Sequence, residues 1–462
     1  MSNFLFNEFE PVSAKEWKQK IQVDLKGADY NETLLWKTNE GITVKPFYHN
    51  DEYVSLTTET NVKKFSICQS VFVDNEKTAN KLVIDALNRG ATAIQFEANE
   101  PFNIEILLEN VIASGAKQSL QLYFKFNFLS LDFINELLEK TKNRKIFLNI
   151  DPIGNLAKSG NWFTQSKEKD FDILKNILLK TSENVSVLAV DVSLYQNAGA
   201  TMVQQVAYAL AHVNEYFNFI LNDNVTSSAV EKPIQFNFAV GSNYFFEIAK
   251  LRAFRYLFSL LCQEYNFNTE SHIFTTPSLR NKTLYDYNVN LLRTTTECMS
   301  AILGGSDVVS NAAYDSFFHK SNEFGERIAR NQLLILQNES YLNEASQIAD
   351  GSYYIEALTE QIAEKALAIF KDIEKTGGFV KQLIEGTIQR KIEESAQKEQ
   401  EQFNNGELIL LGTNKHPNLE DKMKNELELY PFLKIKPRKT SIKPIVPKRL
   451  AEQMEQERLK TE

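Results

Sequence analysis

Histidine and cysteine, the side chains used most often for metal binding and nucleophilic catalysis, are sparse in this chain of 462 residues. They are His49, His212, His272, His319, His416, Cys68, Cys262 and Cys298. None has a second histidine or cysteine at the short spacing that zinc sites use. His212 lies among alanines on an apolar stretch, where a hydrogen-bonded structural histidine is commoner than a metal ligand. The sequence therefore predicts no metal site.

Motifs that hold phosphates or activate nucleophiles are also missing from the sequence. It contains no Cys-x-x-Cys pair, no Gly-x-Ser-x-Gly turn and no Gly-x-x-x-x-Gly-Lys loop. The pairs Gly304-Gly305 and Gly377-Gly378 follow amphipathic stretches, where glycine is typical of a helix end. We therefore expect neither a dithiol redox centre, nor a serine nucleophile, nor a phosphate loop.

Short apolar runs alternate with longer amphipathic stretches through the middle of the chain. The runs are rich in β-branched and aromatic residues, which is typical of buried strands. The stretch 201–217 is the clearest helix, because Val203, Ala207, Leu210, Val213 and Phe217 recur on one face. The predicted strands are 65–73, 93–97, 121–128, 145–150, 186–192, 234–240, 273–276 and 307–310. The predicted helices are 78–88, 104–112, 131–142, 169–180, 201–217, 244–265, 284–303 and 323–342.

This alternation predicts an α/β fold. Near-continuous apolar strands separated by helices indicate a parallel sheet that is covered on both faces. Eight strand–helix units over roughly 280 residues match an eightfold βα (TIM) barrel in size and repeat number. A doubly wound sheet is the alternative, but such sheets usually have fewer units. We therefore expect a TIM barrel with an N-terminal arm and a linker-like C-terminal extension.

Active sites of such barrels form at the carboxyl ends of the strands. Here the segments after strands five, six and seven are 193–197, 241–243 and 275–278, which carry hydroxyl, amide and small side chains. General acids and bases are almost lacking among them. Asp191 is the exception, and a single carboxylate at a strand end more often caps a loop. The carboxyl ends of these strands therefore carry few side chains that could act as catalytic groups.

The segment before the barrel begins with a helix and continues as an arm. Ser13 and Glu16 form a capping box ahead of an apolar face. Residues 26–48 look extended, with apolar anchors at Leu34, Trp36, Ile42, Val44 and Phe47. We expect these anchors to be buried against another chain.

The segment after the barrel combines a charged helix with a proline-spaced stretch. The helix is predicted at 383–403 and a strand-like run at 408–411. Pro437, Pro444 and Pro447 then indicate a semi-rigid linker or an arm lying over a neighbour, before a short polar helix.

Composition excludes several classes of protein. Hydrophobic residues make up 43% and the net charge is −9, so a large core is expected and a nucleic-acid surface is not. No apolar run reaches the ~20 residues of a spanning helix, and the first residues lack a basic-then-apolar leader. Three widely spaced cysteines fit a reducing compartment. These features predict a cytoplasmic protein.

Several segments, in order along the chain, resemble the adenosylcobalamin-dependent acyl-CoA mutases, the methylmalonyl-CoA mutase family. They cover most of the chain, and the resemblance implies the same eightfold barrel. The matching segments are Lys26-Gly27, 40–42 with Lys45-Pro46, 247–253, 287–311, 327–332, 350–356, 390–394 and 412–415.

The sequence departs from this family where active members carry functional residues. After strand five they have Gly-Tyr-His-Met-Gln-Glu-Ala-Gly-Ala, and the alignment puts Leu194 at the histidine and Asn197 at the glutamate. After strand seven their substrate-touching histidine aligns with Ile273, although His272 is one residue away. The arginine–tyrosine element after strand one is absent from 67–71. No histidine has the Asp-x-His-x-x-Gly context of the cobalt ligand.

The resemblance therefore implies the small subunit of a heterodimeric methylmalonyl-CoA mutase. Its partner would be a large catalytic subunit that binds adenosylcobalamin and converts methylmalonyl-CoA to succinyl-CoA. For this chain we expect no catalytic, cofactor-binding or metal-binding residues. The implied organisation is an N-terminal helix and arm over 1–48, a mutase-like barrel over 49–403, and an extension over 404–462 without a cobalamin domain.

Two other interpretations stay open. In the first, this is the catalytic barrel of a split acyl-CoA mutase whose cobalamin domain is on another chain. Chain length fits that arrangement, but Leu194 counts against it. In the second, the barrel is a non-enzymatic scaffold without a mutase partner.

Overall fold

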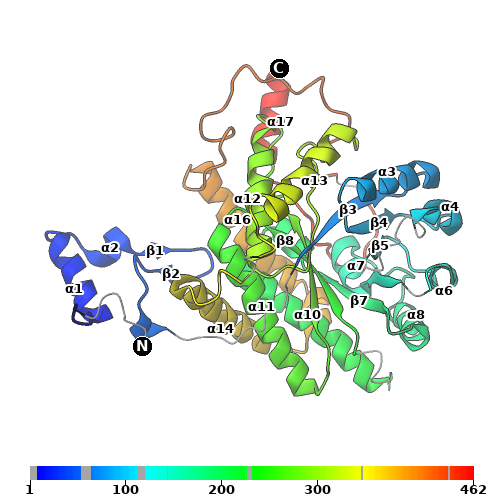
Figure 1. Ribbon diagram of the computed structural model, residues 1–462, viewed down its shortest axis with the longest axis horizontal. Coiled ribbons are helices and arrows are strands. Elements are labelled where there is room, and N and C mark those ends of the chain that lie inside the picture. The colour runs from blue at the N-terminus through cyan, green and yellow to red at the C-terminus, as the bar shows by residue number, and fades with distance from the viewer. Residues whose placement is uncertain are drawn as a thin grey trace.

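A closed barrel of eight parallel strands lies at the centre of the molecule (Figure 1). The computed structural model describes residues 8–53, 64–111, 120–142, 144–223, 225, 231–344, 347–434 and 437–462. The strands follow one another around the barrel in chain order, and β10 closes it by pairing with both β9 and β3. They are β3 (Ser66–Phe72), β4 (Ala93–Ala98), β5 (Gln121–Phe126), β6 (Lys145–Ile150), β7 (Val185–Asp191), β8 (Ile234–Val240), β9 (Ser271–Pro277) and β10 (Val308–Val309). The predicted TIM barrel is confirmed.

Helices surround the barrel and pack their apolar faces on the outer side of the strands. The longest of the helices that connect strands are α10 (Met202–Asn222) and α11 (Tyr244–Tyr265). Both pack against α14 (Tyr353–Lys375). The other described helices between strands are α3 (Glu76–Asn88), α4 (Ile104–Leu108), α6 (Leu131–Lys140), α7 (Pro152–Ser159), α8 (Lys167–Lys180), α9 (Ser193–Asn197) and α12 (Val289–Leu303), and α13 (Glu323–Asn338) follows the last strand.

Three predicted elements differ from the structure. The helix predicted over 284–303 begins at Val289, because Leu284 donates its backbone N–H to Glu455 instead of entering a helix. The helix predicted over 383–403 is divided at Gly386, whose φ of 75° separates α15 (Phe379–Ile384) from α16 (Thr387–Asn404). The helix predicted over 104–112 ends at Leu108, because the chain turns at Asn110, whose φ is 59°; residue 112 lies outside the described residues.

The strand predicted over 408–411 is wrong. Leu411 makes one isolated bridge, to Lys415. The side chain of Asn414 takes the place of a partner strand: it accepts from the N–H of Leu410 and donates to the carbonyls of Phe403 and Leu408. A run of apolar residues here forms a tight loop because an amide side chain satisfies its backbone.

The N-terminal arm has more structure than its sequence indicates. It contains α1 (Ala14–Asp24), whose capping box between Ser13 and Glu16 is present, and α2 (Tyr30–Leu34). A hairpin of β1 (Trp36–Lys37) and β2 (Thr43–Val44) follows, then a short helix η1 (Asn50–Glu52). In Figure 1, α1 and α2 lie at the left, away from the barrel.

The hairpin of the arm is attached to this chain's own barrel. Ile42 is 1% exposed and belongs to the main core. Glu40 accepts a hydrogen bond from the N–H of Val203 in the first turn of α10 (2.9 Å), and Asn39 exchanges two amide hydrogen bonds with Gln402. The expectation that Ile42 is buried against another chain is therefore wrong, whereas α1 buries no residue of its own.

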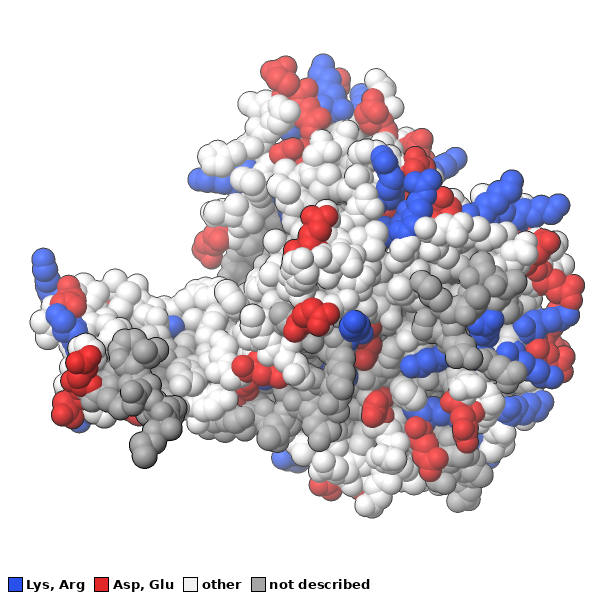
Figure 2. Space-filling model, viewed as in Figure 1, with Lys and Arg blue, Asp and Glu red and all other residues white. Residues whose placement is uncertain are grey.

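Within the described part of the chain, no helix combines the length and the apolar character needed to cross a bilayer. Charged side chains of both signs crowd the rim of the face in Figure 2, while its central area is mostly uncharged.

Candidate functional site at the mouth of the barrel

Aromatic side chains fill the amino-terminal half of the barrel interior. Tyr123 stacks on Phe147 with ring centroids 4.6 Å apart, and Phe147 stacks on His272 at 4.2 Å. The Nε2 atom of His272 lies 2.8 Å from the hydroxyl oxygen of Tyr123. Burial lowers the pKa of His272 to about 4, so the ring is neutral near pH 7. This layer is a packed core.

Polar side chains fill the carboxyl-terminal half, where active barrels bind substrate. Lys125 on β5 lies 3.2 Å from the carboxylate of Asp191, which ends β7. Burial favours a higher pKa for Asp191, but the Lys125 ammonium and the Ser193 hydroxyl outweigh it and lower the pKa. Asp191 raises the pKa of Lys125 above its usual range. The pair is therefore ionised and held in place.

Little free space is left inside the barrel beside Lys125 and Asp191. Asn237 donates to the side-chain oxygen of Asn149 at 3.1 Å, and Gln95 donates to Glu97 at 2.8 Å. The remaining cavity beside Lys125 and Asp191 has a volume of about 40 Å³. That volume suits one or two waters rather than an acyl group.

The residues that replace family functional groups have structural roles here. Leu194 is 4% exposed and belongs to the main core. Asn197 accepts from the Ser278 hydroxyl and from the N–H of Leu279, each at 2.9 Å, so it ties the loop after β7 to the loop after β9. These contacts are made within the chain.

Ile273 and His272 lie on opposite sides of β9. Ile273 is fully buried in the main core outside the barrel, and His272 is in the aromatic layer inside it. Because the two residues are consecutive and have apolar neighbours, the sequence does not show which of them faces the inside of the barrel. His272 is nevertheless near the start of β9, away from the mouth.

His212 is a satisfied core histidine, as its sequence context predicts. Its Nε2 lies 2.9 Å from Asp151 Oδ1, and its Nδ1 lies 2.9 Å from the hydroxyl of Tyr195. Asp151 also accepts from the hydroxyl of Tyr216 and from the N–H of Gly154. Because His212 and Tyr195 are fully buried, this chain of hydrogen bonds fixes α9 and does not meet a substrate.

A cleft of about 440 Å³ opens beside the mouth. Its walls are the arm hairpin, the loops after β7, β8 and β9, and α16. Its floor is an ion pair between Lys250 and Glu247, both of them fully buried. Lys250 also donates to Gln196 (2.8 Å), Gln205 (3.0 Å) and the carbonyl of Ala239 (2.8 Å). Every proton of this ammonium is thus committed, although burial lowers its pKa.

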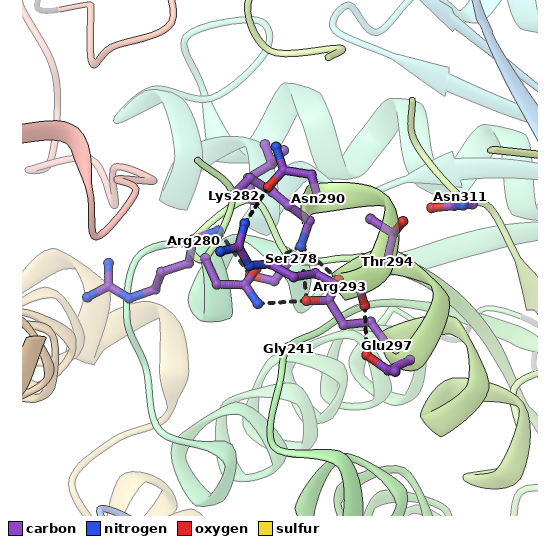
Figure 3. Close-up of polar contacts among 12 residues, drawn as sticks. Gly241, Ser278, Arg280, Lys282, Asn290, Arg293, Thr294, Glu297 and Asn311 are labelled. Atoms are coloured by element: carbon purple, nitrogen blue, oxygen red, sulfur yellow. Dashed lines mark hydrogen bonds and ion pairs between the residues drawn. The ribbon is translucent and has the colours of Figure 1, made fainter. Parts of the chain in front are cut away.

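A second buried ion pair supports the loop after β9 (Figure 3). Lys282 donates to Glu297 on α12 at 2.7 Å, and Asn281 donates to the same carboxylate at 2.6 Å. Burial lowers the pKa of Lys282, and Glu297 opposes that shift. Arg280 extends away from this group and pairs with Glu399 on α16. These charges hold loops in place.

The proline-spaced segment crosses the carboxyl-terminal face of the barrel, and we call residues 437–451 the strap. The N–H groups of Ser441, Ile445, Lys448 and Leu450 donate to the carbonyls of Gly160, Ala157, Asn197 and Arg280. The strap thus joins the loops after β6, β7 and β9. The interpretation of this segment as a linker or an arm over a neighbour is wrong.

The strap is locked by the helix that follows it, α17 (Glu452–Thr461). Arg449 pairs with Glu455 at 2.6 Å, and both are buried. Arg449 also donates to the carbonyl of Lys282, and Glu455 accepts from the N–H of Leu284. Sequence reasoning missed these contacts because the partners are more than 160 positions apart.

Comparison with known proteins shows the family to which this chain is similar. A family model described as methylmalonyl-CoA mutase matches residues 140–460. The chain is 31% identical, over 90% of its length, to the methylmalonyl-CoA mutase small subunit of Porphyromonas gingivalis, and covers 72% of that protein. It is 28% identical over 87% of its length to the methylmalonyl-CoA mutase of Cereibacter sphaeroides, and covers 64% of it. It is 32% identical over 88% of its length to the probable mitochondrial methylmalonyl-CoA mutase of Caenorhabditis elegans, and covers 62% of that protein. The chain therefore spans 62% to 72% of the length of these relatives.

Proposed function

Because this chain belongs to the methylmalonyl-CoA mutase family, we propose that it is the small, non-catalytic subunit of a heterodimeric methylmalonyl-CoA mutase. Its partner in this proposal is a large catalytic subunit that binds adenosylcobalamin. The work of the small subunit is to pair with that partner and stabilise it.

One observation carries the proposal: the chain's own side chains fill the place where a barrel enzyme of this kind would hold substrate. The aromatic layer of Tyr123, Phe147 and His272 fills the lower interior, and the Lys125–Asp191 pair fills the mouth. Inside the barrel, the cavity of about 40 Å³ beside Lys125 and Asp191 cannot admit an acyl thioester. The larger cleft lies over the loops after β7, β8 and β9, and no residue of the barrel strands lines it. Leucine at position 194 has no proton to give or take.

The residues at this mouth do not fit adenosylcobalamin. A corrin ring with its nucleotide and adenosyl groups needs a wide open face, and the strap crosses this one. We therefore assign no step of the rearrangement to this chain.

Isothermal titration of the isolated chain with adenosylcobalamin and with methylmalonyl-CoA tests the proposal, together with an assay for succinyl-CoA. We expect neither binding nor turnover from this chain alone, and formation of a stable complex with a cobalamin-bearing mutase chain. Turnover after addition of a separate cobalamin domain, without another barrel, would instead identify the chain as the catalytic barrel of a split enzyme. Failure to form any complex with a mutase chain would favour a scaffold.

A further inference from the structure

Helices α11, α12 and α13 lie side by side on the outside of the barrel (Figure 1). The side chain of Gln332 joins α13 to α12, since it donates to the carbonyl of Leu291 and to the hydroxyl of Thr295, each at 2.6 Å. On the other side of α12, the residue that ends it, Gly304, lies against Leu251 of α11. The three helices therefore form one continuous layer.

The charged side chains of α11 and α12 are directed into the molecule, although surface helices ordinarily carry their charges on the outer face. Glu264, at the end of α11, is the one charged side chain of these two helices that is exposed. Arg252, for example, is buried and pairs with Glu356 at 2.6 Å. The others are buried or partly buried, and they are Glu247, Lys250, Arg255, Arg293 and Glu297.

The outer side of the layer carries apolar side chains at helical spacing. Leu292 on α12 is 67% exposed, Ile335 on α13 is 45% exposed and Leu260 on α11 is 37% exposed. Each has a partly exposed apolar neighbour one or two turns away on the same helix. We call this surface the α11–α13 face, and it consists of Tyr256, Leu260, Leu292, Met299, Ile328 and Ile335.

Charged side chains lie at the edge of this face. Glu323 and Arg327 pair at the start of α13, and Glu323 also pairs with Arg89 next to α3. In Figure 2 the surface over α12 is mostly uncharged, and charged side chains gather toward the edges of the view. An uncharged centre inside a charged rim is the usual anatomy of a protein–protein interface.

The layer also has nearly the size of a stable interface. Helices α12 and α13 have 15 and 16 residues, which corresponds to a length of about 23 Å. Three helices packed about 8–10 Å apart are about 27 Å wide. The α11–α13 face thus covers roughly 600 Å², against about 800 Å² that each partner buries in a stable complex.

From this arrangement we propose that the α11–α13 face is the surface on which the large mutase subunit docks. The inference rests on the proposed function for the existence of that partner. The face has no lysine or arginine to attract a nucleic acid or an anionic lipid surface. Thr295, Thr296 and Asn331 lie among its apolar residues, and these neutral hydrogen-bonding groups suit another protein surface better than hydrocarbon.

Sedimentation velocity of the full chain mixed with a cobalamin-bearing large mutase subunit tests the proposal. We expect the parent chain to form the complex. Leu292→Glu and Ile335→Glu should each weaken its affinity at least tenfold, because each substitution puts a charge into an apolar contact. Leu292→Ala should weaken it about twofold to fivefold, because it removes contact area without adding a charge.

Leu179→Glu is the matched control. Leu179 is 51% exposed on α8, outside the α11–α13 face, so the same change of residue there should leave the affinity unchanged. Thermal unfolding checks that each variant is folded, which is expected because all the substituted side chains are exposed. If the parent chain assembles and both the Leu292→Glu and Ile335→Glu variants assemble at full strength, the inference is overturned and the proposed function stands.

Two further results would overturn the inference in different ways. If the parent chain forms no complex with a large subunit, the proposed function fails and the face loses its occupant. Sedimentation of the chain alone at micromolar concentration tests a second copy as the occupant, and we expect a monomer. A dimer that Leu292→Glu dissociates, while assembly with the large subunit is unaffected, would assign the face to a second copy of this chain.

Discussion

A histidine at position 194 would enter an apolar surrounding, since Leu194 is packed into the main core. A buried imidazole without a partner costs ~1–3 kcal/mol. We expect Leu194→His to lower the free energy of unfolding of the isolated chain by about that amount, measured by urea denaturation. Leu194→Met, which keeps the site apolar, should change it much less. Turnover of the assembled mutase should be unchanged by Leu194→His, and a change in turnover with assembly intact would mean that this barrel takes part in the chemistry.

Glu374 on α14 makes stability depend on pH. Burial raises its pKa to about 7, with a further contribution from the carboxylate of Glu215. Asn214 donates to one of its oxygens at 2.9 Å. A carboxyl whose pKa is raised by folding favours the native state most when it is protonated. Stability should therefore fall as pH rises from about 4.5 to about 7 and then level off.

Urea unfolding at pH 5 and pH 8 measures this effect. After allowance for partial solvent exposure we expect ~1–2 kcal/mol of the fall to come from Glu374. Glu374→Gln should remove that part of the fall, whereas Glu364→Gln, an exposed position on the same helix, should not. An unchanged pH dependence in Glu374→Gln would contradict the assignment.

At the scale of elements, the hairpin is the part of the arm attached to the barrel, whereas α1 packs on other residues of the arm, with Trp17 against Phe47. Ile42→Ala in the hairpin removes a buried side chain and should destabilise the chain by ~2–4 kcal/mol. Deletion of 1–28 removes α1, which buries no residue, and should change the free energy of unfolding by less than ~0.5 kcal/mol. Thermal unfolding compares the two.

The same deletion tests what α1 is for. Phe9, Val12, Trp17 and Val23 are each more than half exposed on this arm. If the arm holds a large subunit, deletion of 1–28 should weaken the affinity of that complex at least tenfold, measured by sedimentation or titration. Ile42→Ala should reduce complex formation only in proportion to the fraction of unfolded chain. Full-strength assembly of the deleted chain would show that the partner binds elsewhere.

Elements with a strong local pattern could be predicted from the sequence, and elements held by distant contacts could not. Strands 145–150 and 234–240 agree with β6 and β8, because both are apolar on two faces and bounded by turns. Helix α14 was not among the predicted helices, although Ile355, Leu358 and Ile362 recur at helical spacing on its buried side. The α7 helix is short and contains Pro152 and Gly154, so its pattern is weak.

The candidate site, like the fold, could be predicted from the sequence only in part. The shortage of acids and bases at the strand ends is visible in the sequence, and so is the replacement at Leu194. The cleft is not, because its walls come from the arm, three loops and α16. The Lys250–Glu247 pair has a local signal, opposite charges three residues apart among apolar residues of α11, but the sequence does not show that both are buried.

At the scale of the whole molecule, one buried ion pair joins the strap to α17. Arg449→Met should leave Glu455 as an unpaired buried charge and cost ~3–5 kcal/mol. The double variant Arg449→Met, Glu455→Gln should recover much of that loss, because it removes the stranded charge. A double-mutant cycle by chemical denaturation measures the coupling free energy between Arg449 and Glu455. If the two substitutions change the free energy of unfolding additively, the two side chains do not stabilise each other.

The strap also sets the order in which the molecule is completed during synthesis. Glu455 bonds to Leu284, 171 positions earlier, and Ser441 bonds to Asn161, 280 positions earlier. At about 5–20 residues per second, the segment from Leu284 to Glu455 takes roughly 10–35 s to translate. Once β10 has been made within that interval, a nascent barrel has all eight strands and an uncovered mouth. Closure of the mouth is therefore among the last events of folding, and a nascent chain is open to chaperones or early partners at a face that the finished protein covers.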